Sequence, residues 1–203
     1  MPGHRRARPR RTSAAERGRS PRPDAALRIR PYRPTDRPYY ARAVVDLQDH
    51  LTALDPFGVV RRAPAYGVRY VRAAIGLLRK NRGGILIAER DGRPVGFVAA
   101  YVRPRNRVRD LELRPGRHGF VMDLFVDPSA RGHGVGTALL RAAERFLARR
   151  GCTRVWLGVF VPNARAHALY RRLGYADFGV TMTARLDRPG ARGRRRTDSG
   201  RSS

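Results

Sequence analysis

The chain has 203 residues, 41% of them hydrophobic, which is enough apolar material to bury one ordinary α/β core. Lysine and arginine total 44 against 16 acidic residues, a formal net charge of +28. Because Lys80 is the only lysine, we attribute part of this charge to the arginine-rich codon usage of a GC-rich genome.

Cysteine content and hydropathy exclude several classes of protein. The single cysteine, Cys152, leaves no internal disulfide and no cysteine-based zinc site. No apolar run approaches the roughly 20 residues of a membrane helix, and the N-terminus lacks the apolar region of a secretory signal. We therefore expect a cytoplasmic protein without a membrane partner and without a metal site.

Both ends of the chain differ in composition from the middle. Residues 1–26 and 188–203 are rich in Arg, Pro, Gly and Ser and carry few apolar side chains, so ordering them would not repay its entropy cost. We predict two disordered basic tails around one domain at residues 27–187. Nonspecific binding of these tails to nucleic-acid phosphates stays open, and solvated low-complexity tails are the plainer interpretation.

The first elements of the domain are predicted to be a strand and two helices. "LRIRPY" is typical of a short strand, and residues 34–56 combine a Thr35 cap signal with apolar residues at helical spacing. A second helix is expected over residues 64–81, followed by the helix-ending Gly83 and Gly84. Its expected apolar face consists of Val68, Val71, Ile75 and Leu78.

A hairpin follows, and strands then alternate with helices. Asp91-Gly92 between two apolar runs predicts a type I′ turn, and a polar loop is expected over residues 103–118. The alternation that follows predicts a parallel strand pair joined by a right-handed crossover. The expected order is a strand over 119–126, a helix over 134–151, a strand over 153–160, a helix over 163–174 capped by Asn163, and a final strand over 179–186.

The stretch "RGHGVG", residues 131–136, lies between the second-half strand and its helix. It places unpaired backbone N–H groups at a helix N-terminus, where the helix dipole favours an anion such as phosphate. A Walker A loop does not fit because Gly-Lys-Ser/Thr is absent, and the glycine spacing is not that of a dinucleotide-binding fingerprint. A turn that merely allows tight strand–helix packing is the alternative.

Two motifs resemble the signatures of the GNAT superfamily of N-acetyltransferases. One is Arg131-x-x-Gly134-x-Gly136 after "LFVDP", and the other is "VPNARAHALYRRLGY" downstream. The resemblance covers residues 119–179 by motif and residues 27–186 by element order. It implies an α/β (α+β) fold with a mixed, mostly antiparallel twisted sheet, a splayed parallel strand pair and flanking helices. It also implies an enzyme that transfers an acetyl group from acetyl-CoA to an amine acceptor.

The resemblance to the GNAT superfamily implies which residues of this chain bind acetyl-CoA. Backbone N–H groups of the loop are expected to bind the pyrophosphate of CoA, and the strand before it is expected to pair with the pantetheine amides. Asn163 is expected to orient the cofactor arm, although a plain helix cap is an equal interpretation. The expected cofactor-binding residues are Leu124, Phe125, Val126, Arg131, Gly132, His133, Gly134, Val135, Gly136, Thr137 and Asn163.

Two residues are the candidates for catalysis. Tyr170 lies two helical turns past Asn163, and a phenol with a pKa near 10 can protonate the departing CoA thiolate; a core aromatic is the alternative. Met122 occupies the position where many relatives carry the base, so Asp123 is the nearest carboxylate. Strand alternation could turn Asp123 away from the site. Cys152 has no histidine spacing that would activate it as a nucleophile.

The acceptor is less well specified. Asp46, Asp49 and Asp55 lie in and after the first helix, which in relatives borders the acceptor site, and they suggest a small cationic amine. The alternative is that they balance neighbouring arginines. A protein N-terminal or lysine acetyltransferase, a noncatalytic acetyl-CoA sensor and a nucleic-acid-binding protein also stay open, as does a homodimer.

Overall fold

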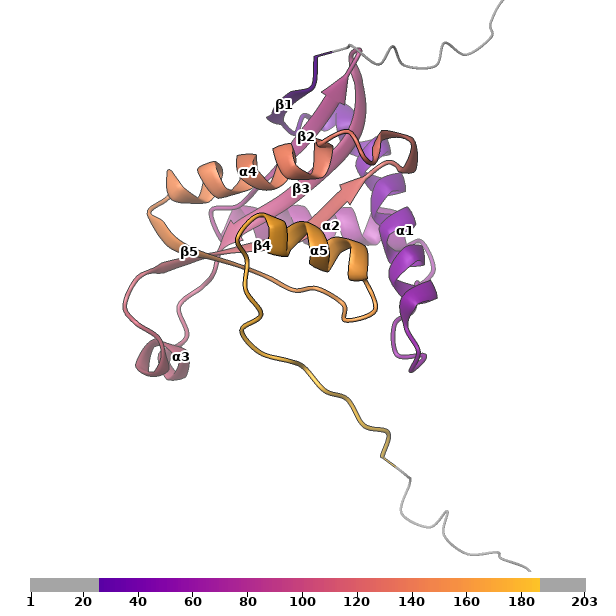
Figure 1. Ribbon diagram of the computed structural model, residues 1–203. Helices are drawn as coiled ribbons and strands as arrows, with labels where there is room; N and C mark the ends of the chain where they lie inside the picture. The colour runs from indigo at the N-terminus through magenta and orange to yellow at the C-terminus, as the bar shows by residue number, and fades with distance from the viewer. Residues whose placement is uncertain (1–25, 187–203) are drawn as a thin grey trace, which may run out of the picture.

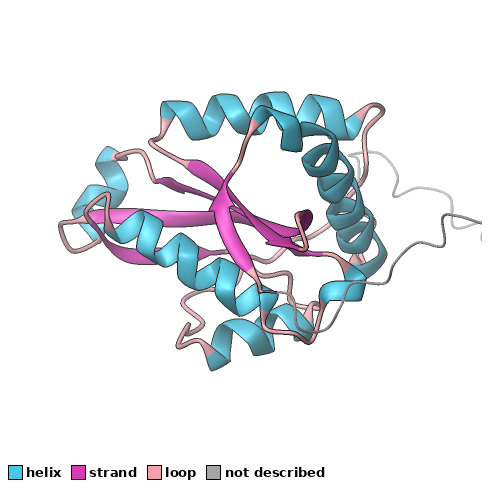
Figure 2. Cartoon of the chain, turned by 90° about the horizontal axis from the view of Figure 1, so that it is seen from above, coloured by secondary structure: helices cyan, strands magenta, loops and turns pink. Residues whose placement is uncertain are grey.

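The structure is a computed structural model that describes residues 26–186 as a five-stranded sheet between two layers of helices (Figures 1 and 2). The tails expected over 1–26 and 188–203 lie outside the described residues, apart from Ala26. The strands follow one another across the sheet in chain order. They are β1 (Arg28–Pro31), β2 (Gly84–Arg90), β3 (Arg93–Val102), β4 (Arg117–Val126) and β5 (Cys152–Leu157).

The pairing of the strands confirms the expected mixed sheet. The pairs β1–β2, β2–β3 and β3–β4 are antiparallel, and β4–β5 is a parallel pair. Asp91 and Gly92 have φ of 51° and 72°, so both residues of the β2–β3 turn are left-handed, as a type I′ turn requires. The helices are η1 (Pro34–Asp36), α1 (Arg37–Leu54), α2 (Tyr66–Lys80), α3 (Arg107–Glu112), η2 (Pro128–Ala130), α4 (Val135–Ala148) and α5 (Ala164–Arg172).

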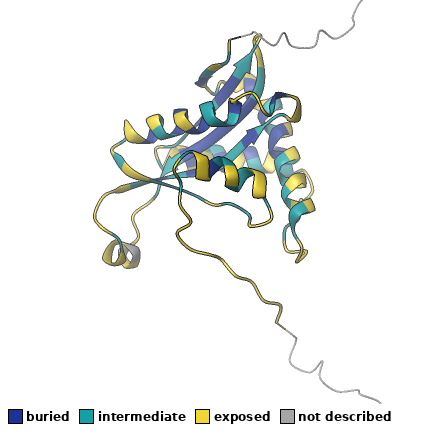
Figure 3. Ribbon diagram, in the orientation of Figure 1, coloured by how far each residue is buried: buried dark blue, intermediate teal, exposed yellow. Residues whose placement is uncertain are grey.

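The core divides into two clusters, one on each face of the sheet (Figure 3). On one face α4 buries Val135, Leu139 and Leu147, which recur at the spacing of a helical apolar stripe. On the other face α1 and α2 bury residues such as Tyr40 and Val71 against the sheet. None of the helices described within residues 26–186 is long and apolar enough to cross a membrane.

One residue of the expected α2 face was assigned wrongly. Val68 is 55% exposed, whereas Val71 and Leu78 are buried. The buried stripe passes through Gly67 instead, because a Cβ at Gly67 would lie 2.5 Å from the carbonyl oxygen of Ala41. Close contact between α1 and α2 therefore requires a glycine at this position and turns Val68 outward.

Two other predicted features also differ. The expected polar loop contains the short helix α3, and the strand expected over 179–186 does not form. A strand needs a hydrogen-bonded neighbour, and no segment of the described chain pairs with residues 179–186. The sequence analysis expected a strand here without identifying a segment for it to pair with.

A buried ion pair, rather than the expected Thr35 cap, fixes the start of α1. Asp36 is the residue before α1, and its carboxylate accepts hydrogen bonds at 2.7 and 2.9 Å from the Arg30 guanidinium. The same carboxylate accepts one from the Arg33 backbone N–H at 2.7 Å. Arg30 also donates to Glu89 on β2 at 2.6 Å. This network connects β1, η1 and β2, and the Arg30 hydrogen bond lowers the pKa of Asp36.

We predict that Asp36→Asn lowers the free energy of unfolding at pH 7 by about 3 kcal/mol, because it leaves the buried Arg30 charge without its main partner. Since the folded pKa of Asp36 is depressed, its stabilisation is present above the usual carboxyl pKa and is lost as the pH falls through the folded value. Urea unfolding at pH 7 and pH 3 measures both effects. The difference in free energy of unfolding between the parent and the Asp36→Asn variant should be smaller at pH 3 than at pH 7. An equal difference at both pH values would contradict the ion-pair explanation.

The matched control is Asp46→Asn. Asp46 faces Arg42 at 4.0 Å on the surface, so the same substitution should change the free energy of unfolding by less than about 0.5 kcal/mol.

Candidate active site

Strands β4 and β5 part in the middle of the sheet. Their pairing ends at Val121 and Leu157, where β5 stops, while β4 continues to Val126. The backbone of Leu124 to Val126 therefore pairs with β3 on one side only. An extended ligand with amide groups can hydrogen-bond to such a free strand edge as an added strand would.

A bulge in β4 decides which side chains reach the gap. Ala99 of β3 lies opposite Asp123 and Ala100 lies opposite Val121, so Met122 is an extra residue in the ladder. Met122 packs against the α1/α2 core cluster, and Asp123 accepts a hydrogen bond from Tyr70 of α2 at 2.7 Å. Both side chains consequently lie on the α1/α2 face, and the carboxylate is not turned away from it.

The glycine-rich loop after β4 presents a run of unpaired backbone donors. Gly132 and Gly134 have φ of 84° and 75°, and Gly134 is the N-cap residue of α4. Within residues 26–186, nothing accepts a hydrogen bond from the N–H groups of residues 132–137. Arg131 folds back and donates to the Val126 carbonyl at 3.0 Å, and His133 is exposed. This is the arrangement of an anion-binding helix N-terminus.

The glycines of the loop differ in their surroundings. A Cβ at Gly132 or Gly134 would meet no atom within 4 Å, so these residues border open space. A Cβ at Gly136 would lie 3.2 Å from Leu169 Cδ2 of α5, so Gly136 allows close packing between α4 and α5. Gly132 and Gly134 therefore leave open space beside the unpaired N–H groups, whereas Gly136 shows the close packing expected of a tight strand–helix turn.

Helix α5 carries the two downstream motif residues. The side-chain oxygen of Asn163 accepts a hydrogen bond from the Ala166 N–H at 3.1 Å, so Asn163 is an N-cap. Tyr170 is only 9% exposed and belongs to the core cluster on the α4 face. Its hydroxyl has no hydrogen-bond partner in the described chain, and burial raises its pKa to about 12. Tyr170 is thus a core aromatic whose phenol stays protonated at neutral pH.

The Asp123 carboxyl is surrounded by tyrosines. Burial raises its pKa to about 6, and the hydrogen bond from Tyr70 opposes that rise. The other titratable groups near it are Tyr40 of α1 and Tyr66 of α2, whose own pKa values are raised by burial and by the Asp123 charge. A carboxyl with a pKa near 6 is ionised at pH 7 and still basic enough to take up a proton.

Tyr170 and Asp123, the two candidates for catalysis, lie on opposite faces of the sheet. Tyr170 packs on the α4 face and Asp123 contacts α2 on the other. Figure 1 shows α5 beside the region where β4 and β5 part.

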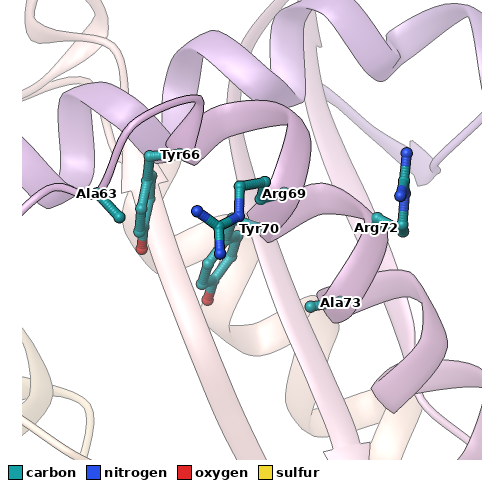
Figure 4. Close-up of a pocket in the computed structure, with 6 residues that line it drawn as sticks. All are labelled: Ala63, Tyr66, Arg69, Tyr70, Arg72 and Ala73. Atoms are coloured by element: carbon teal, nitrogen blue, oxygen red, sulfur yellow. The ribbon is translucent and has the colours of Figure 1, made fainter.

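A depression on α2 adjoins Asp123 and was not anticipated. Tyr66 and Tyr70 stack with ring centroids 5.2 Å apart, and their hydroxyls point the same way in Figure 4. Tyr66 donates to Gln48 of α1 at 3.1 Å, which connects α1 to the depression. The i, i+4 spacing of the two tyrosines was the available signal. The lining residues are Ala63, Tyr66, Arg69, Tyr70, Arg72 and Ala73.

The three acids considered for the acceptor all have partners within the chain. Asp46 lies 4.0 Å from Arg42, and Asp49 lies 2.6 Å from Arg62. Asp55 accepts hydrogen bonds from backbone N–H groups of the following loop, which lower its pKa. These contacts match the alternative that the acids balance arginines and shape the loop.

Two other side-chain types were considered at the sequence level. Burial raises the pKa of the Cys152 thiol, which disfavours the nucleophilic thiolate. Residues 26–186 bring no three His, Cys, Asp or Glu side chains together in a way that could hold a metal ion.

Comparison with known proteins decides the family. The model of the Acetyltransferase (GNAT) family matches residues 46–175, which include β4, the glycine loop and α5. The chain belongs to the GNAT acetyltransferase family. The resemblance seen in the two motifs is therefore confirmed, and so is the fold that it implied.

Several curated acetyltransferases are similar to about half of the chain. An uncharacterised N-acetyltransferase of Methanocaldococcus jannaschii is 37% identical over 101 residues, which are 50% of this chain and 42% of that protein. A mycothiol acetyltransferase of Salinispora arenicola is 52% identical over 93 residues, 42% of this chain and 30% of that protein. The chain spans less than half the length of these relatives.

Solved structures show the same fold over nearly the whole described domain. An aminoglycoside N-acetyltransferase in complex with CoA has a TM-score of 0.60 at 19% identity, covering 80% of this chain and 95% of that chain. Glucosamine-6-phosphate N-acetyltransferase of Arabidopsis thaliana has a TM-score of 0.55 at 16% identity, covering 80% and 99%. GNAT acetyltransferases use acetyl-CoA as the acyl donor.

We predict that Gly134→Val weakens acetyl-CoA binding by at least about tenfold, because a branched residue is strained at φ of 75° and its side chain enters the open space beside the N–H groups. Isothermal titration calorimetry with CoA measures the effect. Gly76→Val on the exposed side of α2, where a Cβ also meets nothing, is the control that should bind normally. Unchanged binding by a folded Gly134→Val protein would remove the loop from the cofactor site.

Proposed function

We propose that the protein transfers an acetyl group from acetyl-CoA to the primary amine of a small cationic molecule. The observation that carries this proposal is the gap between β4 and β5, with unpaired loop donors at one end, Asp123 on one face and Tyr170 on the other. The named relatives, which include mycothiol acetyltransferases, support acetyl transfer.

Binding of the donor falls to backbone groups. The N–H groups of residues 132–137 would hold the diphosphate, and the helix dipole of α4 adds to their attraction. The free edge of β4 at residues 124–126 would hydrogen-bond to the amides of the pantetheine arm. Asn163 uses its side-chain oxygen as a helix cap, which leaves its NH₂ group for the same arm.

Two residues of the chain would take part in proton transfer, Asp123 as the base and Tyr170 as the acid. An amine arrives mostly as its ammonium ion, and Asp123 accepts the proton that must leave before nitrogen can attack the thioester carbonyl. The new carbon–nitrogen bond replaces the carbon–sulfur bond, and the Tyr170 phenol gives its proton to the departing thiolate. The nitrogen loses its second proton as the amide forms, and that proton passes through solvent to the Tyr170 phenolate and restores the phenol. The acetyl group passes directly to nitrogen, without a covalent enzyme intermediate.

The surroundings of Asp123 support a cationic acceptor. Its carboxylate attracts an ammonium group, and the stacked faces of Tyr66 and Tyr70 can stabilise a second positive group by cation–π attraction. Because Asp46, Asp49 and Asp55 have partners, they are not needed for this preference.

Thiol release from acetyl-CoA in the presence of an amine panel tests the function. The panel contains monocationic and dicationic small amines, a peptide with a free N-terminus and an N-terminally blocked lysine peptide. Acceleration by dicationic amines supports the proposal. Acceleration only by peptides would make the protein a peptide acetyltransferase, and no acceleration with intact CoA binding would make it a sensor.

Tyr170→Phe should lower kcat by roughly a hundredfold or more without changing acetyl-CoA affinity, as expected for loss of a general acid. The removed hydroxyl has no hydrogen-bond partner among the described residues, so stability should hardly change. Tyr175→Phe is the control, because that hydroxyl is bonded to Glu144 at 3.1 Å. Equal kcat for the Tyr170→Phe variant and the parent would leave Tyr170 as a core residue only.

The pH dependence of kcat/KM should report Asp123. Because the base must be ionised, kcat/KM should rise with pH through an apparent pKa of about 6, and Asp123→Asn should abolish this limb. Tyr70 donates to the carboxylate and thereby lowers its pKa, so Tyr70→Phe should move the limb to higher pH. Stopped assays across pH 5 to about 8 measure the shift.

Tyr66→Phe is the control for this pH shift. Tyr66 stacks on Tyr70 but donates its hydroxyl proton to Gln48, so its removal should leave the limb in place. A limb that stays at the same pH in the Tyr70→Phe variant would show that another group is the base.

A further inference from the structure

Three aromatic side chains form a row across one face of the sheet. Tyr101 of β3 lies opposite Phe120 of β4, and Phe120 lies opposite Trp156 of β5. Tyr101 packs against the α1/α2 core cluster, and residues directly opposite one another in a sheet share a face, so the whole row lies on the α1/α2 face. Each of the three residues stays partly exposed. The row lies near the start of β4, whereas the glycine loop follows its end.

A second row, of basic side chains, runs beside the aromatic row. Arg103, His118 and Arg154 each lie two residues from an aromatic member, so the strand period of two puts them on the same face. The Arg103 backbone N–H bonds to the His118 carbonyl at 2.8 Å, and His118 lies opposite Arg154, so the three are neighbours. The Arg103 guanidinium carbon lies 5.4 and 5.7 Å from the ring centroids of Phe120 and Trp156. The two rows therefore form one continuous surface.

No acidic side chain belongs to the strand segments that carry this surface. Residues 98–103, 117–122 and 152–157 contain neither Asp nor Glu. Arg103 and Arg154 form no ion pair with any residue of the described chain. Flat rings beside uncompensated positive charge, in a protein of net charge +28, are complementary to a partner that carries both flat rings and negative charges.

We propose that this surface binds single-stranded nucleic acid. Unpaired bases would stack on the aromatic rings and on the Arg103 guanidinium, and the arginines would contact phosphates. A duplex does not fit, because its bases are already stacked inside it. Residues 1–26 and 188–203 are rich in arginine but contain no aromatic residue, so stacking distinguishes this surface from the tails. The inference does not depend on the proposed acetyl transfer.

Fluorescence of Trp156, the only tryptophan of the chain, tests the proposal without any substitution. Labelled oligouridylate and oligothymidylate of about 12 nucleotides are added to the full chain at about 0.3 M salt, which weakens phosphate contacts of the tails. The indole emission should be quenched in step with the rise in anisotropy of the label, and the tighter oligonucleotide identifies the preferred sugar. A rise in anisotropy without quenching would assign binding to the tails and overturn the proposal.

Phe120→Leu keeps an apolar side chain but removes a flat ring, so it should weaken binding of the tighter oligonucleotide by at least about tenfold. Phe57→Leu is the matched control, because Phe57 is an exposed aromatic residue of the α1–α2 loop, outside the two rows. This control should bind like the parent. Equal affinities of the two folded variants would overturn the proposal, and the Trp156 titration still tests it if Phe120→Leu does not fold.

The contribution of charge is tested with Arg103→Gln. This variant should bind more weakly and should lower the slope of log affinity against log salt by about one, the value for one lost phosphate contact. Arg93→Gln removes the same charge from an exposed position beside the β2–β3 turn and should leave the slope unchanged. Equal slopes for the two variants, displacement of the oligonucleotide by CoA, or quenching by a peptide but by neither oligonucleotide would each overturn the proposal.

Discussion

The parting of β4 and β5 after Val121 and Leu157 is the constraint on which the rest of this structure depends. While the strands pair, their backbone groups satisfy one another and no ligand can enter. Beyond that point β4 keeps a free edge, and the chain turns through the glycine loop into α4. The same parting thus leaves a free strand edge, to which an extended chain could hydrogen-bond, close to a helix N-terminus of the kind that favours an anion.

The electrostatics of the site differ from those of the whole chain. Although the protein has a net charge of +28, burial raises the pKa of Asp123 and the Tyr70 hydrogen bond lowers it, and no arginine among residues 26–186 is a cause of the shift. An arginine beside this carboxylate would depress its pKa and weaken it as a base. The arginines are used elsewhere, at Asp36, Asp49 and Asp127, where they fix loops and helix ends. Burial is what raises the pKa of this carboxyl, and the hydrogen bond from the uncharged Tyr70 offsets only part of that rise.

The sequence predicted those parts of the site that depend on local backbone, and it missed those set by tertiary contacts. Gly134 and Asn163 were assigned correctly as N-terminal positions of helices, because left-handed backbone and side-chain capping leave local signals. The orientation of Asp123 could not be derived, because the bulge at Met122 depends on how β3 pairs. Thr35 was expected to be the cap, and Asp36 was missed for a similar reason, since its Arg30 partner becomes apparent only in the folded chain.

Because of the bulge, the methionine at position 122 no longer argues against catalysis. With regular alternation, Met122 and Asp123 would face opposite sides, and a methionine at the usual base position would argue against catalysis. Because the extra residue places both on the α1/α2 face, a carboxylate is available one position later on the side where Tyr70 can bond to it. The methionine side chain then packs against the same cluster, and apolar packing of this kind helps to desolvate the neighbouring carboxylate. The residue that weakened the case for an enzyme at the level of sequence therefore helps to explain why the neighbouring acid has a pKa suited to proton transfer.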